Sequence, residues 1–194
     1  MKTIVIYNTQ TGFTKQYAEY IAQKLGCLCW PMRGLYSQIL EDYDLVIFGS
    51  WVMGGALNHL PRMHQLCRNR PMVVFGVGST SESEGLDELL ISQNHLENTP
   101  FFYFRGGLRL EQLPIHHRMM LRSVQKALAR KKNPQPQEAE MAQLLQSSFD
   151  RVDLSLADAL VKKVRELAGE EGIERTAPEA ESAPHTEPGT SSEE

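Results

Sequence analysis

The chain has 194 residues, of which 41% are hydrophobic and 23% charged, as is typical of a soluble globular protein. Its three cysteines show no Cys-x-x-Cys spacing, which argues against a disulfide framework or a zinc site and favours reduced thiols. The sequence contains neither an apolar run of about 18 residues, as a membrane span needs, nor a basic start followed by a long apolar stretch. We therefore expect a cytoplasmic protein.

The net charge of −4 hides two parts of opposite sign. From residue 169 to the end, eight Glu and one Arg give −7, which leaves +3 for residues 1–168. This end segment is rich in Pro, Glu, Ser and Thr and has almost nothing apolar to bury, so residues 169–194 are predicted to be an acidic, disordered tail. Residues 1–168 are long enough for one domain with a substantial core.

Up to residue 104, short apolar runs alternate with helical patterns. In chain order, the sequence predicts a strand over 3–7, a helix over 13–25, strands over 27–31 and 44–48, a helix over 57–69, a strand over 72–77, a helix over 86–96 and a strand over 101–104. The apolar runs are continuous, as in strands that are covered on both faces. The predicted fold class is therefore α/β, with a doubly wound, five-stranded parallel sheet of strand order 2-1-3-4-5 and helices on both faces.

The rhythm changes after the fifth strand. Residues 114–132, 137–148 and 154–168 show successive helical patterns without a sixth strand, which predicts extra C-terminal helices and a helical insertion over about 105–150.

Residues 105–132 contain eight Lys or Arg and one Glu. Four of these cations recur at every fourth residue: Arg118, Arg122, Lys126 and Arg130. Such a stripe on helix 114–132 is either a solvated face or a surface for an anionic membrane, an acidic substrate or an acidic redox partner. Nucleic acid is a poor fit, because the stripe lacks interleaved aromatic residues on which bases could stack.

Three threonines surround a glycine between the first strand and the first helix. This segment consists of Thr9, Gln10, Thr11, Gly12, Phe13 and Thr14. Ligands of such sheets bind beyond the carboxyl ends of the strands, and the free N–H groups and dipole of a helix N-terminus attract anions. The three hydroxyls add uncharged donors, so the segment predicts a phosphate site; the simpler alternative is that Thr11 or Thr14 caps the helix. The lysine of a nucleotide-hydrolysing P-loop and the spaced glycines of a dinucleotide fingerprint are both absent from the sequence.

The pattern T-x-T-G-x-T resembles the phosphate loop of the flavodoxin-domain family. Two further segments match that family's loops after the third and fourth strands: Ser50, Trp51, Val52, Met53, Gly54 and Gly55, and Gly78, Ser79 and Thr80. The resemblance implies that FMN is the cofactor, with its phosphate at residues 9–14 and Trp51 beside its ring; the alternative for Trp51 is packing under its own loop. It also implies that a peptide at Gly54 or Gly55 rotates with the redox state. The tyrosine usual in the third loop is missing, since residues 79–84 are polar and contain no aromatic.

A narrower resemblance is to the menaquinone-dependent protoporphyrinogen dehydrogenases, flavodoxin-fold enzymes of bacterial haem synthesis. Residues 102–108 (FYFRGGL) and 119–121 (MML) carry it. The family resemblance implies an FMN-binding redox protein that exchanges electrons with a redox partner protein or with a quinone- or porphyrin-type small molecule.

Two alternatives stay open: a quinone-dependent protoporphyrinogen dehydrogenase-like enzyme, and a flavin-free binding module on the same fold. A phosphoacceptor receiver domain is excluded, because Asn8 and Gly49 stand where that domain needs acids. The sequence singles out no catalytic nucleophile, no general base and no metal-ligand spacing.

Overall fold

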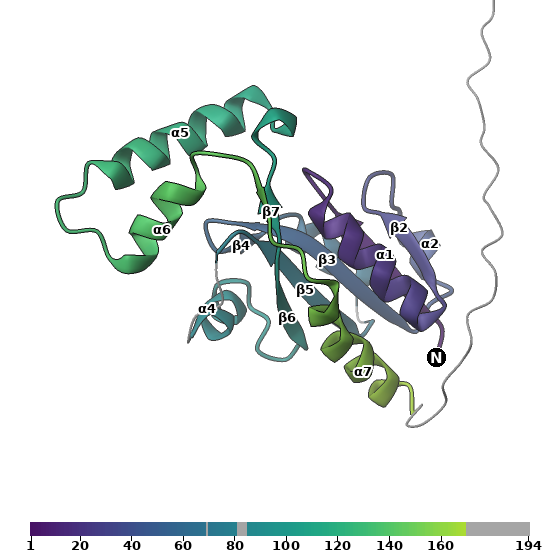
Figure 1. The fold of residues 1–194 in the computed structure, drawn as a ribbon. Coiled ribbons are helices and arrows are strands. Elements are labelled where there is room, and N and C mark those ends of the chain that lie inside the picture. Colours follow the sequence, from purple (N-terminus) through teal and green to yellow (C-terminus); the bar gives the residue numbers. More distant parts are fainter. Residues whose placement is uncertain (69, 81–84, 170–194) are drawn as a thin grey trace, which may run out of the picture.

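Five parallel strands form the centre of the computed structural model, which describes residues 1–68, 70–80 and 85–169 (Figure 1). The strands are β1 (Thr3–Asn8), β2 (Leu28–Pro31), β3 (Leu45–Met53), β5 (Met72–Gly78) and β6 (Phe101–Arg105). Their spatial order is β2-β1-β3-β5-β6, and each neighbouring pair is parallel. Counted along the chain this is the order 2-1-3-4-5, so the predicted fold class is confirmed. Residues 170–194 of the predicted tail and residues 81–84 of the third loop lie outside the described residues.

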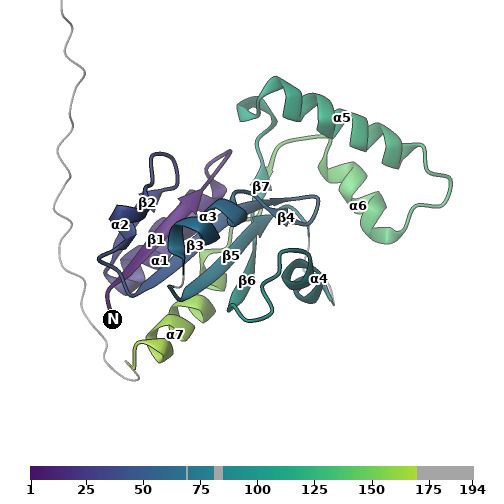
Figure 2. The same cartoon turned by 180° about the vertical axis from the view of Figure 1, so that it is seen from behind.

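Alternate residues of each strand point to opposite faces of the sheet, and helices cover both faces (Figures 1 and 2). The helices are α1 (Phe13–Leu25), α2 (Ser37–Leu40), α3 (Leu60–Cys67), α4 (Leu86–Gln93) and α7 (Asp158–Leu167). On one face Val5 packs in a cluster with Phe75 and Phe104, covered by α1 and α7. On the other face Ile4 packs in a cluster with Met63 of α3. The continuous apolar runs are explained by these two cores.

The end of β3 differs from the prediction. β3 continues to Met53 and turns back into a short antiparallel strand, β4 (Ala56–Leu57), instead of ending at residue 48. Because Leu57 pairs with Val52 in this hairpin, α3 begins at Leu60 and not at residue 57. The short helix α2 was likewise not predicted, since four residues show no helical period.

Between β6 and α7 the chain forms a helical projection on a two-stranded base. The elements are β7 (Gly107–Leu108), η1 (Leu110–Gln112), α5 (Ile115–Ala129), α6 (Pro136–Leu144), β8 (Phe149–Asp150) and η2 (Leu154–Ala157). β7 pairs antiparallel with β8, so the expectation of no further strand is wrong; two residues each are too few for a recognisable strand pattern. α5 and α6 pack on each other and extend away from the sheet (Figures 1 and 2), and we call these two helices and their connecting loop the arm.

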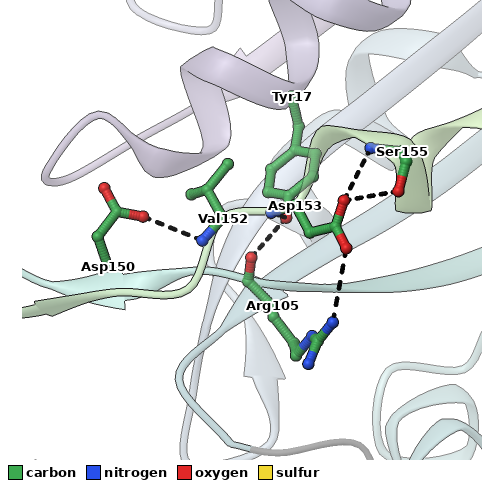
Figure 3. Close-up of polar contacts among 6 residues, drawn as sticks. All are labelled: Tyr17, Arg105, Asp150, Val152, Asp153 and Ser155. Carbon is green, nitrogen blue, oxygen red and sulfur yellow. Dashed lines mark hydrogen bonds and ion pairs between the residues drawn. The ribbon is translucent and has the colours of Figure 1, made fainter.

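The hydroxyl of Tyr17, on α1, ties both ends of this excursion to the core (Figure 3). It donates a hydrogen bond of 2.6 Å to the carbonyl of Arg105, at the end of β6, and accepts one of 3.0 Å from the amide of Asp153. The Tyr17 ring is fully buried and stacks on Phe104, with the ring centroids 4.9 Å apart. Burial raises the pKa of Tyr17 above its usual value, so the hydroxyl keeps the proton that it donates.

Asp153 is itself fixed by its neighbours (Figure 3). Its carboxylate accepts hydrogen bonds from the amide and hydroxyl of Ser155, at 3.2 and 2.6 Å, and lies 3.7 Å from a guanidinium nitrogen of Arg105. These hydrogen bonds from Ser155, and to a lesser degree the charge of Arg105, lower the pKa of Asp153. Because folding lowers the pKa of Asp153, its ionised carboxylate stabilises the folded state at pH values above the pKa of the unfolded chain. This stabilisation is lost as the pH falls through the folded pKa.

Replacing Tyr17 with Phe should remove both hydrogen bonds and keep the ring packing. Because the carbonyl and amide left behind are partly buried, we expect the free energy of unfolding to fall by about 1–3 kcal/mol, as measured by urea denaturation. Tyr20→Phe is the matched control, since it removes one exposed hydrogen bond, to Asp158, from the same helix. Equal losses in the two variants would contradict a special role for Tyr17.

Candidate functional site

A cavity of about 590 Å³ opens where the loops at the carboxyl ends of the strands meet the arm. All predicted site residues except Gly12 and Ser50 line it: Thr9, Gln10, Thr11, Phe13, Thr14, Trp51, Val52, Met53, Gly54, Gly55, Gly78, Ser79 and Thr80. The structure therefore brings the three predicted loops together in one place. Cavities of roughly 300–1,000 Å³ are usual for small ligands and cofactors.

The loop after β1 leaves the N-terminus of α1 open to a ligand. Gly12 is the N-cap residue and has a φ of 92°, a left-handed conformation that glycine adopts without strain. Because the N-cap residue is Gly12, neither Thr11 nor Thr14 occupies the capping position considered above. The hydroxyl of Thr9 accepts a hydrogen bond of 3.0 Å from the amide of Gly12, which leaves its own proton for another acceptor. This combination of hydroxyls and helix-start amides suits an anion.

A cationic side chain reaches this loop from the base of the arm. Arg109, directly after β7, donates a hydrogen bond of 3.1 Å from Nη1 to the carbonyl of Thr11. Its guanidinium lies over the ring of Phe13, 4.5 Å from the ring centroid, and Nη2 is 3.6 Å from a carboxylate oxygen of Asp150 on β8. The loop sequence indicates uncharged donors at this corner and gives no sign of Arg109, which is 98 residues from Thr11 in the chain.

The β3–β4 hairpin carries Trp51 to the cavity. Gly54 and Gly55 form its two-residue turn with φ values of 60° and 85°, as this type of tight hairpin turn requires. Trp51 is half-buried, and its ring meets that of His117 on α5 edge-on, with the centroids 5.9 Å apart. Because Trp51 is only partly covered, part of its ring can contact a ligand in the cavity that it lines.

Ser50 lies underneath this hairpin and is fully buried. Its hydroxyl donates a hydrogen bond of 2.6 Å to the carbonyl of Asn58, and it accepts one of 3.2 Å from the side chain of Asn8. Ser50 thus joins the end of β1 to the base of the hairpin, and does not line the cavity.

Asn94, at the end of α4, fixes the glycine turn from the other side. Its Nδ2 donates hydrogen bonds of 2.8 Å to the carbonyls of Gly55 and Leu90, and its Oδ1 accepts one of 2.8 Å from the amide of Leu57. α4 therefore ends at Gln93, before the predicted residue 96, because Asn94 turns to the hairpin. The peptide after Gly55 is held by Asn94, whereas the peptide between Gly54 and Gly55 is not.

The third loop is anchored to β6. The carbonyl of Gly78 accepts a hydrogen bond of 2.7 Å from the amide of Gly106, and the carbonyl of Thr80 accepts one of 2.9 Å from the hydroxyl of Tyr103. Tyr103 also lines the cavity. An aromatic ring missing from the loop itself is thus present nearby on β6, where the sequence indicated only a strand.

The arm gives the cavity an apolar wall that the sequence analysis does not predict. The side chains of this wall come from α5 and from the residues just before α5 and just after α6: Leu113, His117, Met120, Leu121, Val124 and Leu145. On α5 itself, His117, Met120 or Leu121, and Val124 follow one another at intervals of three or four residues, which is the spacing of one helix face, but the sequence does not say what that face meets. α4 contributes three more lining residues: Leu86, Leu89 and Leu90. No side chain of α5 is buried, and contact of its basic residues with an anionic membrane stays a prediction.

The thiols of the chain are not activated. Burial raises the pKa of Cys27, Cys29 and Cys67 to about 12, so they are protonated at neutral pH and poor nucleophiles. In the ranges that the structure describes, no three His, Cys, Asp or Glu side chains are placed to hold a metal ion. No helix within the described residues combines the length and apolar character needed to cross a bilayer.

A family model described as a flavodoxin domain matches residues 4–135 of the chain. The chain belongs to the flavodoxin-domain family. The matched residues of this flavodoxin domain include all three cavity loops, Arg109 and α5. No protein of curated function matches the chain in sequence.

Solved structures with similarity to this flavodoxin domain include three flavodoxins. Oxidised flavodoxin 1 from Bacillus cereus is 17% identical, with 60% of this chain and 88% of that chain covered and a TM-score of 0.40. A flavodoxin from the domain Archaea is 17% identical, with coverage of 84% and 99% and a TM-score of 0.39. Two-electron reduced Megasphaera elsdenii flavodoxin is 12% identical, with coverage of 74% and 97% and a TM-score of 0.39.

Replacing Asn94 with Leu should release the glycine turn while keeping the size of the side chain. Loss of the hydrogen bonds to Gly55 and Leu57 should speed hydrogen exchange of the hairpin amides by about tenfold, since one or two hydrogen bonds are worth about 1.4 kcal/mol. Hydrogen-exchange mass spectrometry of a peptide covering residues 51–58 measures this. Ser92→Ala, at an exposed position of the same helix, should leave exchange unchanged; the same exchange rates in Asn94→Leu as in the wild type would show that the turn needs no such support.

Proposed function

We propose that this flavodoxin domain binds FMN and passes electrons through it between a donor and an acceptor. The observation that carries the proposal is the composition of a single cavity. It joins an uncapped helix N-terminus with threonine hydroxyls to the aromatic side chain of Trp51 and to apolar walls. A ligand that combines a phosphate monoester with a large flat ring matches both parts.

The loop after β1 would hold the phosphate. Thr9, Thr11 and Thr14 line the cavity, and Thr14 is almost completely buried in the first turn of α1. Their hydroxyls and the amides of the helix start would donate hydrogen bonds to phosphate oxygens, and the positive end of the helix dipole favours the same charge. These are the residues that the family pattern assigns to the phosphate.

The hairpin and the third loop would hold the ring. Trp51, Val52 and Met53, together with the glycine turn, form one part of the cavity, and residues 78–80 and Tyr103 form another. The apolar side chains of the arm that line the cavity would cover a ring bound between the hairpin and the third loop. FMN supplies reversible electron transfer when it is bound, and the chain supplies position, shelter from water and electrostatics.

A second candidate is an enzyme with its own substrate, as the resemblance to menaquinone-dependent protoporphyrinogen dehydrogenases implies. The observation that favours it is the wall from the arm, because a surface of Met, Leu and Val suits an apolar quinone- or porphyrin-type molecule. Turnover of protoporphyrinogen with menaquinone by the purified, flavin-loaded protein separates the enzyme from a carrier that serves a redox partner protein. A colourless protein that takes up no added FMN favours the flavin-free binding module.

Protein purified with its flavin should show absorption bands at about 375 and 450 nm, the bands of an oxidised flavin.

Replacing Thr11 and Thr14 together with Ala should raise the dissociation constant for FMN by at least about tenfold, because hydrogen bonds to a charged group are worth about 1.5–3 kcal/mol each. Equilibrium dialysis measures the change. Thr3→Ala, at the opposite end of β1, is the control and should bind as the wild type does; unchanged binding by the double variant would place the phosphate elsewhere.

The charge around the cavity also predicts a redox property. The end of β3 and the hairpin turn that follows, residues 49–58, contain no Asp or Glu, so like-charge repulsion from this segment does not disfavour a reduced, anionic flavin. Met53→Glu places a carboxylate at the cavity and should lower the midpoint potential of the two-electron couple by about 20 mV or more, equivalent to about 1 kcal/mol. Redox titration measures the shift, with Met53→Gln as the uncharged control. A potential that stays the same in Met53→Glu would mean that Met53 does not lie near the ring.

A further inference from the structure

We propose that Arg109 is a charged contact for the phosphate of the bound nucleotide, carried to the phosphate loop by the base of the arm. This inference rests on the function proposed above and adds a residue that the family pattern of the loop does not contain. It assigns to Arg109 the discrimination between a flavin that carries a phosphate monoester and one that lacks it.

The phosphate loop alone balances little of the ligand's charge. Residues 9–14 contain no charged side chain, and a helix N-terminus offers the equivalent of about half a positive charge. A phosphate monoester carries about −1.5 to −2 at neutral pH. An additional cation is therefore favourable at this corner, and the loop sequence does not provide one.

Arg109 lies against the turn of residues 11–12, next to the cavity but not among the residues that line it. Nη1 donates to the carbonyl of Thr11 and is 3.4 Å from the position that a Cβ of Gly12 would occupy, so the guanidinium rests directly against the turn. A guanidinium has five N–H donors in a planar fork, and the contacts to Thr11 and Asp150 need two of its nitrogens. Remaining N–H groups on the same fork can turn to an oxygen of a phosphate held by the loop.

The orientation of Arg109 is set before any ligand arrives. Its side chain is about one-third exposed, at 35%; the guanidinium lies over the ring of Phe13, and Nη2 lies beside the carboxylate of Asp150. Asp150 is held in turn by the amide of Val152, which donates a hydrogen bond of 3.0 Å to it. Because β7 and β8 are paired at Gly107 and Asp150, the cation and its partner keep a fixed relation to the loop.

The contact between β7 and the phosphate loop is close. A Cβ on Gly107 would come within 2.3 Å of the backbone carbonyl oxygen of Phe149 on β8 and within 2.6 Å of the ring of Phe13, so glycine lets β7 approach both. Arg109 follows two residues later and is therefore also close to the phosphate loop, where it bonds Thr11. The cation is thus supplied by tertiary packing and not by the loop that binds the phosphate.

A purely structural role for Arg109 makes a different prediction. If the guanidinium acts at the phosphate end of the ligand, its loss weakens binding of FMN and spares riboflavin, which has the same ring and no phosphate. If it only supports the loop through its hydrogen bond to Thr11, that loss is the same at low and at high salt; if it neutralises the phosphate, the loss shrinks as the salt concentration rises. The two flavins therefore locate the effect, and its salt dependence separates charge from support.

The experiment is a fluorescence titration of the full-length apoprotein with FMN and with riboflavin, for the wild type and for Arg109→Gln. Glutamine keeps a hydrogen-bond donor and removes the charge. We expect the dissociation constant for FMN to rise roughly fivefold to thirtyfold and that for riboflavin to change by less than about twofold. Arg109→Lys should recover part of the FMN affinity. Arg151→Gln is the matched control, since it removes the same charge from the residue next to Asp150, where the guanidinium lies over Phe149.

Raising the salt concentration provides a second measurement on the same samples. FMN binding should weaken more with salt in the wild type than in Arg109→Gln, because the lost interaction is electrostatic. Equal weakening of FMN and riboflavin in Arg109→Gln, or no weakening of either, overturns the inference and leaves the proposed function intact. A wild-type protein that binds neither flavin overturns the proposed function and this inference with it.

Discussion

One phenolic oxygen, on Tyr17, determines where the arm leaves the sheet and where it returns. It bonds the carbonyl that ends β6 and the amide that begins the path to α7. With both ends of the excursion fixed to the same side chain of α1, β7 and β8 are brought together and laid across Phe13. The apolar wall on α5, which lines the cavity, and the guanidinium of Arg109, which bonds Thr11, both belong to this excursion.

Much of the fold could be predicted from the sequence, because its signals are local. Strands buried on both faces give continuous apolar runs, and α1 shows a complete helical period that ends at Gly26, whose φ of 62° is left-handed. The cavity loops could be found for a related reason. In a parallel sheet of this order, segments that follow neighbouring strands meet at one edge, so placing the strands also places the loops.

The remaining features depend on contacts between distant segments. Asn94 gives no sign in the sequence that it will hold Gly55, and Arg109 gives none that it will bond Thr11. The two-residue strands β7 and β8 are formed by mutual pairing and tertiary packing, not by a pattern of their own. His117 illustrates the limit: nothing distinguishes it on the face of α5, and it matters because its ring meets that of Trp51 on β3, far away in the sequence. Such residues become visible only when the path of the backbone is known.

The pairing of Gly107 with Asp150 has a consequence for how this site can change. The chain leaves the sheet and returns to it at adjacent points, so the residues in between form a closed loop. The length of such a loop has little effect on the stability of the sheet, because doubling the length of a flexible loop raises its closure free energy by only about 0.6 kcal/mol. The residues that would contact the nucleotide's ring lie at the ends of strands β3 and β5 or just after them, whereas the apolar wall opposite them belongs to the excursion between β7 and β8. Exchange of one segment could therefore change which molecule meets the cavity while the half built on the strands stays as it is.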